Sequence, residues 1–138
     1  MNDPLKGIHI LVVEDEDDAR ELLKVLLETH GGDVTVTASV QEALSAYDQS
    51  RPHVIVADIG MPNHNGYTLI AKVRARDRER GSMIPAIALT AFTTPMDRDT
   101  ALSAGFQVHM SKPFEPNRLI AVILDLASKQ NQNDQSSV

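Results

Sequence analysis

The fold is decided by one stretch of the sequence, Val54-Ile55-Val56-Ala57-Asp58-Ile59-Gly60-Met61-Pro62. Its apolar residues suit a buried strand, which ends on the carboxylate of Asp58 before glycine and proline interrupt the strand pattern. Two more apolar runs end on oxygen-bearing side chains: residues 9–13 lead to Glu14 and Asp15, and residues 85–89 lead to Thr90. Three strand ends therefore carry side chains that can bind a metal ion or attack an electrophile.

Short apolar runs alternate along the chain with longer stretches of helical periodicity, a pattern typical of strand–helix units in a parallel sheet. We expect strands near residues 8–14, 33–38, 53–57, 84–89 and 106–110. We expect helices near residues 16–30, 39–49, 66–78, 95–104 and 115–128. The pattern predicts an α/β fold with a flavodoxin-like, doubly wound, five-stranded parallel sheet in the order 2-1-3-4-5, together with five helices.

Local signals support the first two helices and the end of the domain. An apolar stripe in the first helix is expected to lie against the sheet; its members are Ala19, Leu22, Leu23, Leu26 and Leu27. Ser39 and Glu42 have the spacing of a capping box at the start of the second helix. The chain is too polar to pack after residue 128, so we expect an N-terminal extension at 1–7, one domain at 8–128 and a disordered tail or linker stump at 129–138.

The composition fits one cytoplasmic domain. A chain of 138 residues with 42% hydrophobic content has room for one core, and a domain of this size buries roughly two-thirds of its unfolded surface. The absence of cysteine excludes a disulfide framework and a thiolate metal site. No run reaches the roughly 18 to 20 apolar residues that cross a bilayer, so we expect a soluble chain without membrane contact.

The charge argues against nucleic acid as a partner. The formal net charge is −6, whereas phosphate backbones are bound by clusters of lysine and arginine. One basic run, residues 72–80, alternates with acidic residues at the end of a predicted helix. Cations are favourable at that end of a helix, so we interpret this run as a solvated helix terminus.

The predicted strand order brings the acidic strand ends together. Strands one and three become neighbours, so Glu14, Asp15 and Asp58 converge on a space that needs positive charge. Mg²⁺ suits such oxygen ligands, and Lys112, which follows the fifth strand, supplies a second cation at the same edge. A carboxylate between two cations can attack phosphorus and form an acyl phosphate, and the Thr90 hydroxyl could then bind a phosphoryl oxygen.

The motifs in this order resemble the receiver domain of two-component response regulators, and the likeness spans residues 8–128. They are Leu11-Val12-Val13-Glu14-Asp15, Asp58-Ile59-Gly60-Met61-Pro62 through Gly66, Leu89-Thr90-Ala91 and Lys112-Pro113-Phe114. The resemblance implies that Asp58 accepts a phosphoryl group from a histidine kinase or phosphorelay. It also implies that Glu14, Asp15 and the Gly60 carbonyl help to hold Mg²⁺. By the same resemblance, Lys112 contacts the phosphoryl group and Thr90 is the switch hydroxyl. Segments 85–91 and 104–113 are most similar to receivers of hybrid histidine kinases.

One position departs from the family pattern. Receivers usually carry tyrosine or phenylalanine three residues before the lysine, and here His109 takes that place. A histidine ring is smaller and titratable near neutral pH, so we expect a switch of different strength. The resemblance implies a signal carried by helix four, strand five and helix five, with a histidine kinase or histidine phosphotransfer protein as partner and a possible homodimer through that surface.

Three other functions compete with a receiver that catalyses only its own phosphorylation and dephosphorylation. A haloacid-dehalogenase-type phosphatase would also use an aspartyl phosphate and Mg²⁺, but its acidic metal residues lie late in the chain. A flavin carrier would need a phosphate-cradling loop after strand one, where this chain is acidic. A receiver-like docking module that is never phosphorylated would normally have a degraded acidic site, and this one is intact.

Overall fold

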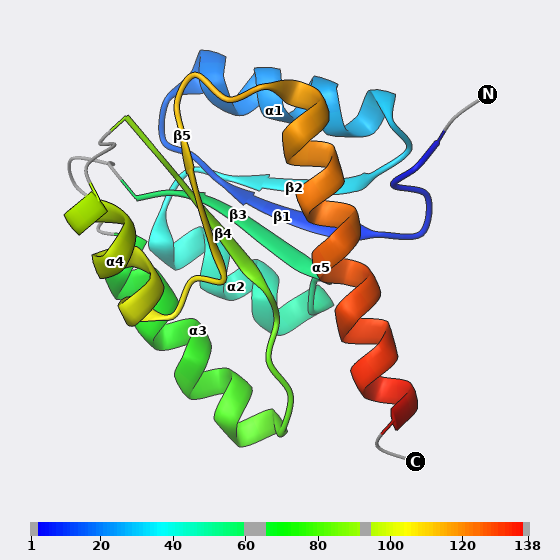
Figure 1. The fold of residues 1–138 in the computed structure, drawn as a ribbon, viewed down its shortest axis with the longest axis vertical. Coiled ribbons are helices and arrows are strands. Elements are labelled where there is room, and N and C mark those ends of the chain that lie inside the picture. Colours follow the sequence, from blue (N-terminus) through cyan, green and yellow to red (C-terminus); the bar gives the residue numbers. More distant parts are fainter. Residues whose placement is uncertain (1–2, 60–65, 92–94, 137–138) are drawn as a thin grey trace.

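Strands and helices alternate along the chain in the computed structural model, which describes residues 3–59, 66–91 and 95–136 and gives the backbone alone for 95–97 and 130–136 (Figure 1). The strands are β1 (His9–Val13), β2 (Asp33–Thr37), β3 (Val54–Asp58), β4 (Ala86–Thr90) and β5 (Val108–Ser111). The helices are α1 (Asp17–Thr29), α2 (Val40–Ser50), α3 (Gly66–Arg80), α4 (Pro95–Ala104) and α5 (Pro116–Ser136). Each lies within a few residues of its prediction, apart from the end of α5.

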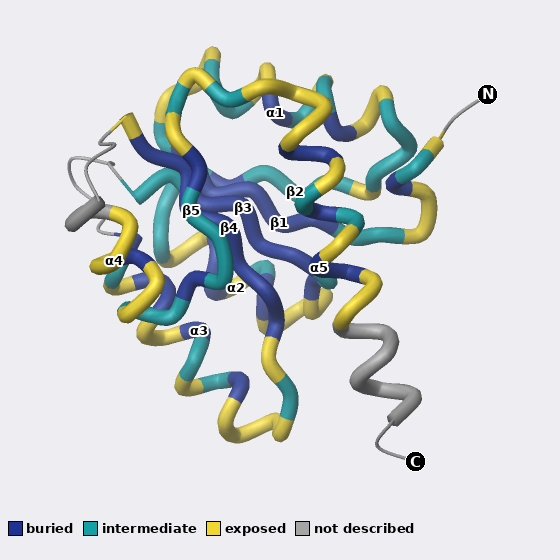
Figure 2. Tube along the Cα trace, viewed as in Figure 1, coloured by how far each residue is buried: buried dark blue, intermediate teal, exposed yellow. Residues whose placement is uncertain are grey.

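The strands form one parallel sheet in the order β2-β1-β3-β4-β5, which confirms the predicted order. Helices α1 and α5 cover one face, and α2, α3 and α4 cover the other (Figure 1). Alternate residues of a strand face opposite layers, so Ile10 and Val12 pack with α1 and α5 while Leu11 and Val13 pack with α2 and α3. The central strands are buried on both faces (Figure 2), which explains their continuous apolar sequences.

Helix α2 begins as the sequence predicts. The Ser39 hydroxyl oxygen accepts a hydrogen bond of 3.1 Å from the Glu42 backbone N–H. The Glu42 carboxylate in turn accepts a hydrogen bond of 3.3 Å from the Ala38 N–H. The first bond satisfies an N–H group that the first turn of a helix leaves without a partner, and the second holds the residue that precedes the N-cap.

Helix α1 buries only part of its predicted stripe. Leu23 and Leu27 are 3% and 0% exposed, as expected, but Leu22 is 63% exposed. Successive helical residues are about 100° apart, so Leu22 falls outside the arc that the sheet covers. Val25 is also exposed, and α1 therefore presents large apolar side chains to its surroundings.

Helix α5 continues to Ser136, so the predicted end near residue 128 is wrong. An ion pair of 3.2 Å joins Asp125 to Lys129 across that point, and a pair with this spacing stabilises a helix. None of the helices in the described ranges has the length and apolar character that crossing a membrane requires.

The basic run at residues 72–80 is not wholly solvated, which corrects the sequence interpretation for Arg74. Its side chain is only 12% exposed and lies 2.5 Å from the buried carboxylate of Asp77. The same guanidinium donates hydrogen bonds of 3.0 and 2.7 Å to the Gly105 carbonyl. Because Asp77 brings a buried acceptor to this side of α3, Arg74 turns inward and links α3 to the segment before β5.

Candidate functional site

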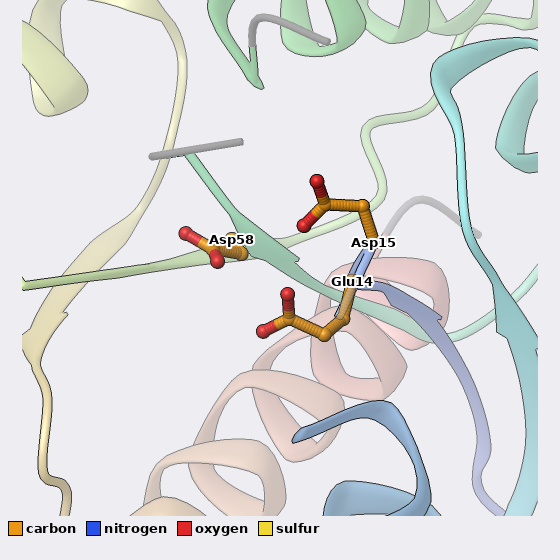
Figure 3. Close-up of side chains that lie close together, drawn as sticks. All are labelled: Glu14, Asp15 and Asp58. Atoms are coloured by element: carbon orange, nitrogen blue, oxygen red, sulfur yellow. The ribbon is translucent and has the colours of Figure 1, made fainter. Parts of the chain in front are cut away.

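Three carboxylates meet where β1 and β3 end. One oxygen from each of Glu14, Asp15 and Asp58 lies within 4.8 Å of the others, and the side chains converge in Figure 3. The parallel register pairs Val13 with Ala57, so the next residues, Glu14 and Asp58, lie side by side. Asp15 follows Glu14 directly in the chain. The predicted convergence is therefore present in the structure.

Lys112 joins this cluster from the far edge of the sheet. Its ammonium donates hydrogen bonds of 2.9 Å to Glu14 Oε1 and 3.0 Å to Asp58 Oδ2. Its backbone N–H donates to the Thr90 carbonyl at 2.8 Å, which ties the lysine to the end of β4. The peptide bond to Pro113 is cis. One cation is thus shared between two of the three carboxylates.

Burial sets the electrostatics of the site. The Glu14 side chain is 1% exposed, and those of Asp58 and Lys112 are 14% and 28% exposed. Burial raises the pKa of Glu14, with a further rise from the charge of Asp58, although the hydrogen bond from Lys112 opposes it. Burial works against the charge of Lys112, but its hydrogen bonds to Glu14 and Asp58 prevail and raise its pKa. Lys112 is therefore a cation at neutral pH.

The residues present fit a hard divalent cation. Three carboxylates face one ammonium, so an excess of negative charge remains within the cluster. Carboxylate oxygens are the ligands that Mg²⁺ prefers, and Mg²⁺ is commonly held by one or two of them with water and phosphate oxygens. Gly60, whose carbonyl is the fourth expected ligand, lies outside the described residues.

The two expected switch residues lie on one face of the sheet. Thr90 ends β4 and is fully buried, and the register pairs Ala88 with His109 and Thr90 with Ser111. Side chains two residues apart in a strand share a face, so Thr90 and His109 both point to the layer that holds Ala88 and the helices α2, α3 and α4. Within the described residues, the buried Nε2 atom of His109 has no hydrogen-bond partner.

Arg20 contacts the turn that carries the acidic pair, a contact that the sequence pattern did not predict. Its Nη1 atom donates hydrogen bonds of 3.1 Å to the Glu14 carbonyl and 3.3 Å to the Asp15 carbonyl. Its Nη2 atom lies 2.5 Å from the Asp17 carboxylate. The sequence signal that could have identified Arg20 is its position as a cation in the first turn of a helix, where the helix dipole disfavours positive charge.

An apolar groove borders the acidic cluster and was also not predicted. It has a volume of about 490 Å³, and Glu14 and Lys112 form its end toward the cluster. Its other lining residues come mainly from α1 and the segment before α5, and include Ala19, Leu22, Leu26, Pro113 and Phe114. The exposure of Leu22 is thus explained, because this side chain forms a wall of the groove.

Comparisons with known proteins agree on one family. The family model described as response regulator receiver domain matches residues 10–124. An uncharacterized 14.6 kDa protein of Leptolyngbya boryana is 41% identical over 119 residues, which cover 86% of this chain and 89% of that protein. The transcriptional regulatory protein TrcR of Mycobacterium tuberculosis is 35% identical over 124 residues, covering 90% of this chain but 47% of TrcR.

Solved structures give the same result. The signal receiver domain of a signal transduction histidine kinase from Syntrophus aciditrophicus superposes with a TM-score of 0.78 at 30% identity. The match covers 89% of this chain and 92% of that one. The chain thus spans nearly all of an isolated domain but about half the length of TrcR and of similar regulators.

Proposed function

Because the chain belongs to the family of response regulator receiver domains, the phosphoacceptors of two-component signal transduction, we propose that Asp58 is the residue that accepts the phosphoryl group. One observation carries this proposal: the Asp58 carboxylate, at the end of a central strand, shares the Lys112 ammonium with Glu14 and lies beside Asp15. Domains of this family are generally not enzymes apart from catalysing their own phosphorylation.

The donor in this proposal is a phosphohistidine of a kinase or of a histidine phosphotransfer protein. An oxygen of Asp58 attacks phosphorus, the phosphorus–nitrogen bond of the donor breaks, and the imidazole leaves with the electron pair. Lys112 stays bonded to the acidic cluster and offsets negative charge on the transferring oxygens. Mg²⁺, held by Glu14, Asp15 and Asp58 with the Gly60 carbonyl as the expected fourth ligand, would supply further positive charge against those oxygens.

The proposed response passes through Thr90 and His109. The Thr90 hydroxyl binds a phosphoryl oxygen, and His109 on the neighbouring strand adjusts to the space that Thr90 leaves. Two observations support a coupled movement of Thr90 and His109. Both residues lie on the same face of the sheet, and both Thr90 and the His109 Nε2 atom are buried. The outcome is a shift in the surface formed by α4, β5 and α5, which binds a downstream partner or a second copy of the chain.

The apolar groove beside the cluster is the proposed docking surface for the histidine-bearing partner. A donor histidine must come within bonding distance of Asp58, so the partner surface around it has to cover the residues that border the site. Glu14 and Lys112 belong both to the acidic cluster and to the groove, which makes the two surfaces continuous. Asp17 and Asp18 are acidic residues in the first turn of α1. The partner should therefore carry an apolar ridge that enters the groove, with basic residues around that ridge.

The mass of the intact protein tests the phosphoacceptor directly. The chain is incubated with Mg²⁺ and either acetyl phosphate or phosphoramidate, a small donor that has the phosphorus–nitrogen bond of phosphohistidine. We expect one phosphoryl adduct, which is absent in Asp58→Asn and absent when a chelator replaces Mg²⁺. An adduct that persists in Asp58→Asn would place the reaction on another residue. A folded wild-type chain without any adduct from either donor would favour the unphosphorylated docking module.

A further inference from the structure

Arg20 ties the start of α1 to the backbone that carries the acidic pair. Its Nη1 atom lies between the carbonyl oxygens of Glu14 and Asp15, at 3.1 and 3.3 Å. Its Nη2 atom pairs with Asp17, so one planar group bridges the turn and the first residue of the helix. The Arg20 side chain is 23% exposed, so most of its surface is shielded from solvent.

The position of Arg20 has an electrostatic cost that its contacts must offset. The residue lies in the first turn of α1, at the positive end of the helix dipole, where a cation is unfavourable. A guanidinium can donate to several acceptors at once with fixed directions, whereas an ammonium has no such planar fork. The three contacts of Arg20 use that fork, and two of them are to neutral carbonyl oxygens. The planar geometry of the guanidinium, and not its charge alone, therefore suits this position.

Other hydrogen bonds of the turn hold atoms different from those that Arg20 holds. The Glu14 N–H donates to the Thr37 carbonyl at 3.0 Å, and the Glu14 carboxylate accepts from the Glu16 N–H at 3.2 Å. These bonds hold the strand side of the turn and one carboxylate. The two successive carbonyls, those of Glu14 and Asp15, are held from the helix side by Arg20.

We propose that Arg20 is a positioning residue for the divalent-cation site: by holding the Glu14 and Asp15 carbonyls, it keeps the carboxylates of that pair directed toward Asp58. The inference rests on the proposed function, because it concerns the same acidic cluster. Arg20 acts on the cation through the backbone and is not itself a ligand. Loss of a group that orients metal ligands typically lowers metal affinity about 10- to 100-fold.

Charge and positioning predict opposite results when Arg20 is replaced. Arg20→Gln removes a positive charge beside an acidic cluster, and by electrostatics alone Mg²⁺ should bind more tightly. If the guanidinium positions the ligands, Mg²⁺ should bind about 10-fold more weakly even though a positive charge has been removed. The direction of the change therefore separates the two explanations.

Isothermal titration calorimetry of the full chain with Mg²⁺ measures this direction. Arg20→Lys keeps the charge without the fork, and we expect it to bind Mg²⁺ more weakly than the wild type. Lys24→Gln is the matched control, since it removes a cation one turn further along the same helix. We expect its Mg²⁺ affinity to equal or slightly exceed that of the wild type.

Circular dichroism in the presence of chelator checks that each variant is folded. If Arg20→Gln is not folded, the Mg²⁺ affinity of Arg20→Lys provides the test. Equal or tighter Mg²⁺ binding by folded Arg20 variants would overturn the positioning role while leaving the proposed function intact. Equal weakening in Lys24→Gln would show that the effect does not depend on the contacts of Arg20 with the turn, and would also overturn it. A wild-type chain that does not bind Mg²⁺ would overturn both the cation site and the role of Arg20.

Discussion

The ammonium of Lys112 lies 3.0 Å from Oδ2 of Asp58, although the two residues are 54 positions apart in the sequence. The same ammonium bonds to Glu14, whose side chain is almost fully buried. A buried carboxylate is costly without a paired cation, so the proposed reaction site depends on Lys112 for its stability as well as for its chemistry.

Lys112→Gln should therefore destabilise the chain when Mg²⁺ is absent. Removing the cation takes away the ammonium that Glu14 and Asp58 share, and leaving a buried group such as Glu14 unsatisfied costs about 1–3 kcal/mol. Urea unfolding in chelator measures the loss, and added Mg²⁺ should restore part of it in the variant. Lys129→Gln is the control, because its ion pair with Asp125 is exposed. Equal losses in the two variants would show that Lys112 has no special role in the cluster.

The pH dependence of stability should reveal the burial of Glu14. Burial raises the pKa of Glu14 above its ordinary value of 4.5, so between 4.5 and the folded-state pKa the folded chain retains a proton that the unfolded chain has released. Stability falls as pH rises through that window. Glu14→Gln cannot titrate, and its free energy of unfolding in chelator should lack this fall. Urea midpoints measured in steps from pH 4 to neutrality test the difference, and parallel curves for the two proteins would contradict it.

The sequence predicted which side chains meet, because strand order and strand ends together determine it. Apolar runs of strand length end at Val13 and at residue 57, and adjacent parallel strands bring the next residues together. The cation from the end of β5 follows from the same reasoning. Such predictions need only the type and position of side chains along the chain.

Arg20 and Arg74 could not be assigned in this way. Besides their ion pairs with Asp17 and Asp77, these arginines donate to backbone carbonyls, those of Glu14 and Gly105. Every residue has a carbonyl, so no side-chain pattern marks these additional partners. Leu22 illustrates a second limit. Helical periodicity identified an apolar stripe, but the neighbours of a helix decide how much of the stripe is covered.

Two arginines on α3 should differ strongly in their effect on stability. Arg74 pairs with Asp77 where both side chains are nearly buried, whereas Arg76 pairs with Asp48 at the surface. Removing one partner of a buried pair costs roughly 3–5 kcal/mol, and an exposed pair contributes about 0.2–1 kcal/mol. Chemical denaturation of Arg74→Gln and Arg76→Gln compares the same substitution on the same helix. Similar losses would mean that Asp77 is satisfied without Arg74.

Tyr47 should ionise only at strongly alkaline pH. Burial and its hydrogen bond to Asp77 raise the pKa of Tyr47 to about 12. The chain has two tyrosines, so in Tyr67→Phe the ultraviolet absorbance of tyrosinate reports Tyr47 alone. Since the unfolded chain loses this proton near its ordinary pKa of 10.0, stability should decline as pH rises above 10.0. Ionisation near 10.0 in the folded variant would contradict the buried pairing with Asp77.

Leu22→Ser should weaken docking of the histidine-bearing partner without affecting the chemistry at Asp58. Leu22 is exposed and lines the groove beside the acidic cluster, so its loss should leave folding stability within about 0.5 kcal/mol. A buried apolar anchor at an interface is worth about 1–2 kcal/mol, so the dissociation constant for the kinase or phosphotransfer protein that phosphorylates the wild type should rise roughly 5- to 30-fold.

Phosphorylation by acetyl phosphate, which needs no docking surface, should proceed at the wild-type rate in Leu22→Ser. The matched control is Leu102→Ser on α4, because Leu102 is also a large exposed apolar residue but lies outside the groove. Phosphotransfer from the protein donor should slow in Leu22→Ser and stay unchanged in Leu102→Ser. Equal rates from the protein donor in the wild type, Leu22→Ser and Leu102→Ser would show that the groove is not part of the docking surface. The rate with acetyl phosphate shows separately whether the site at Asp58 is intact.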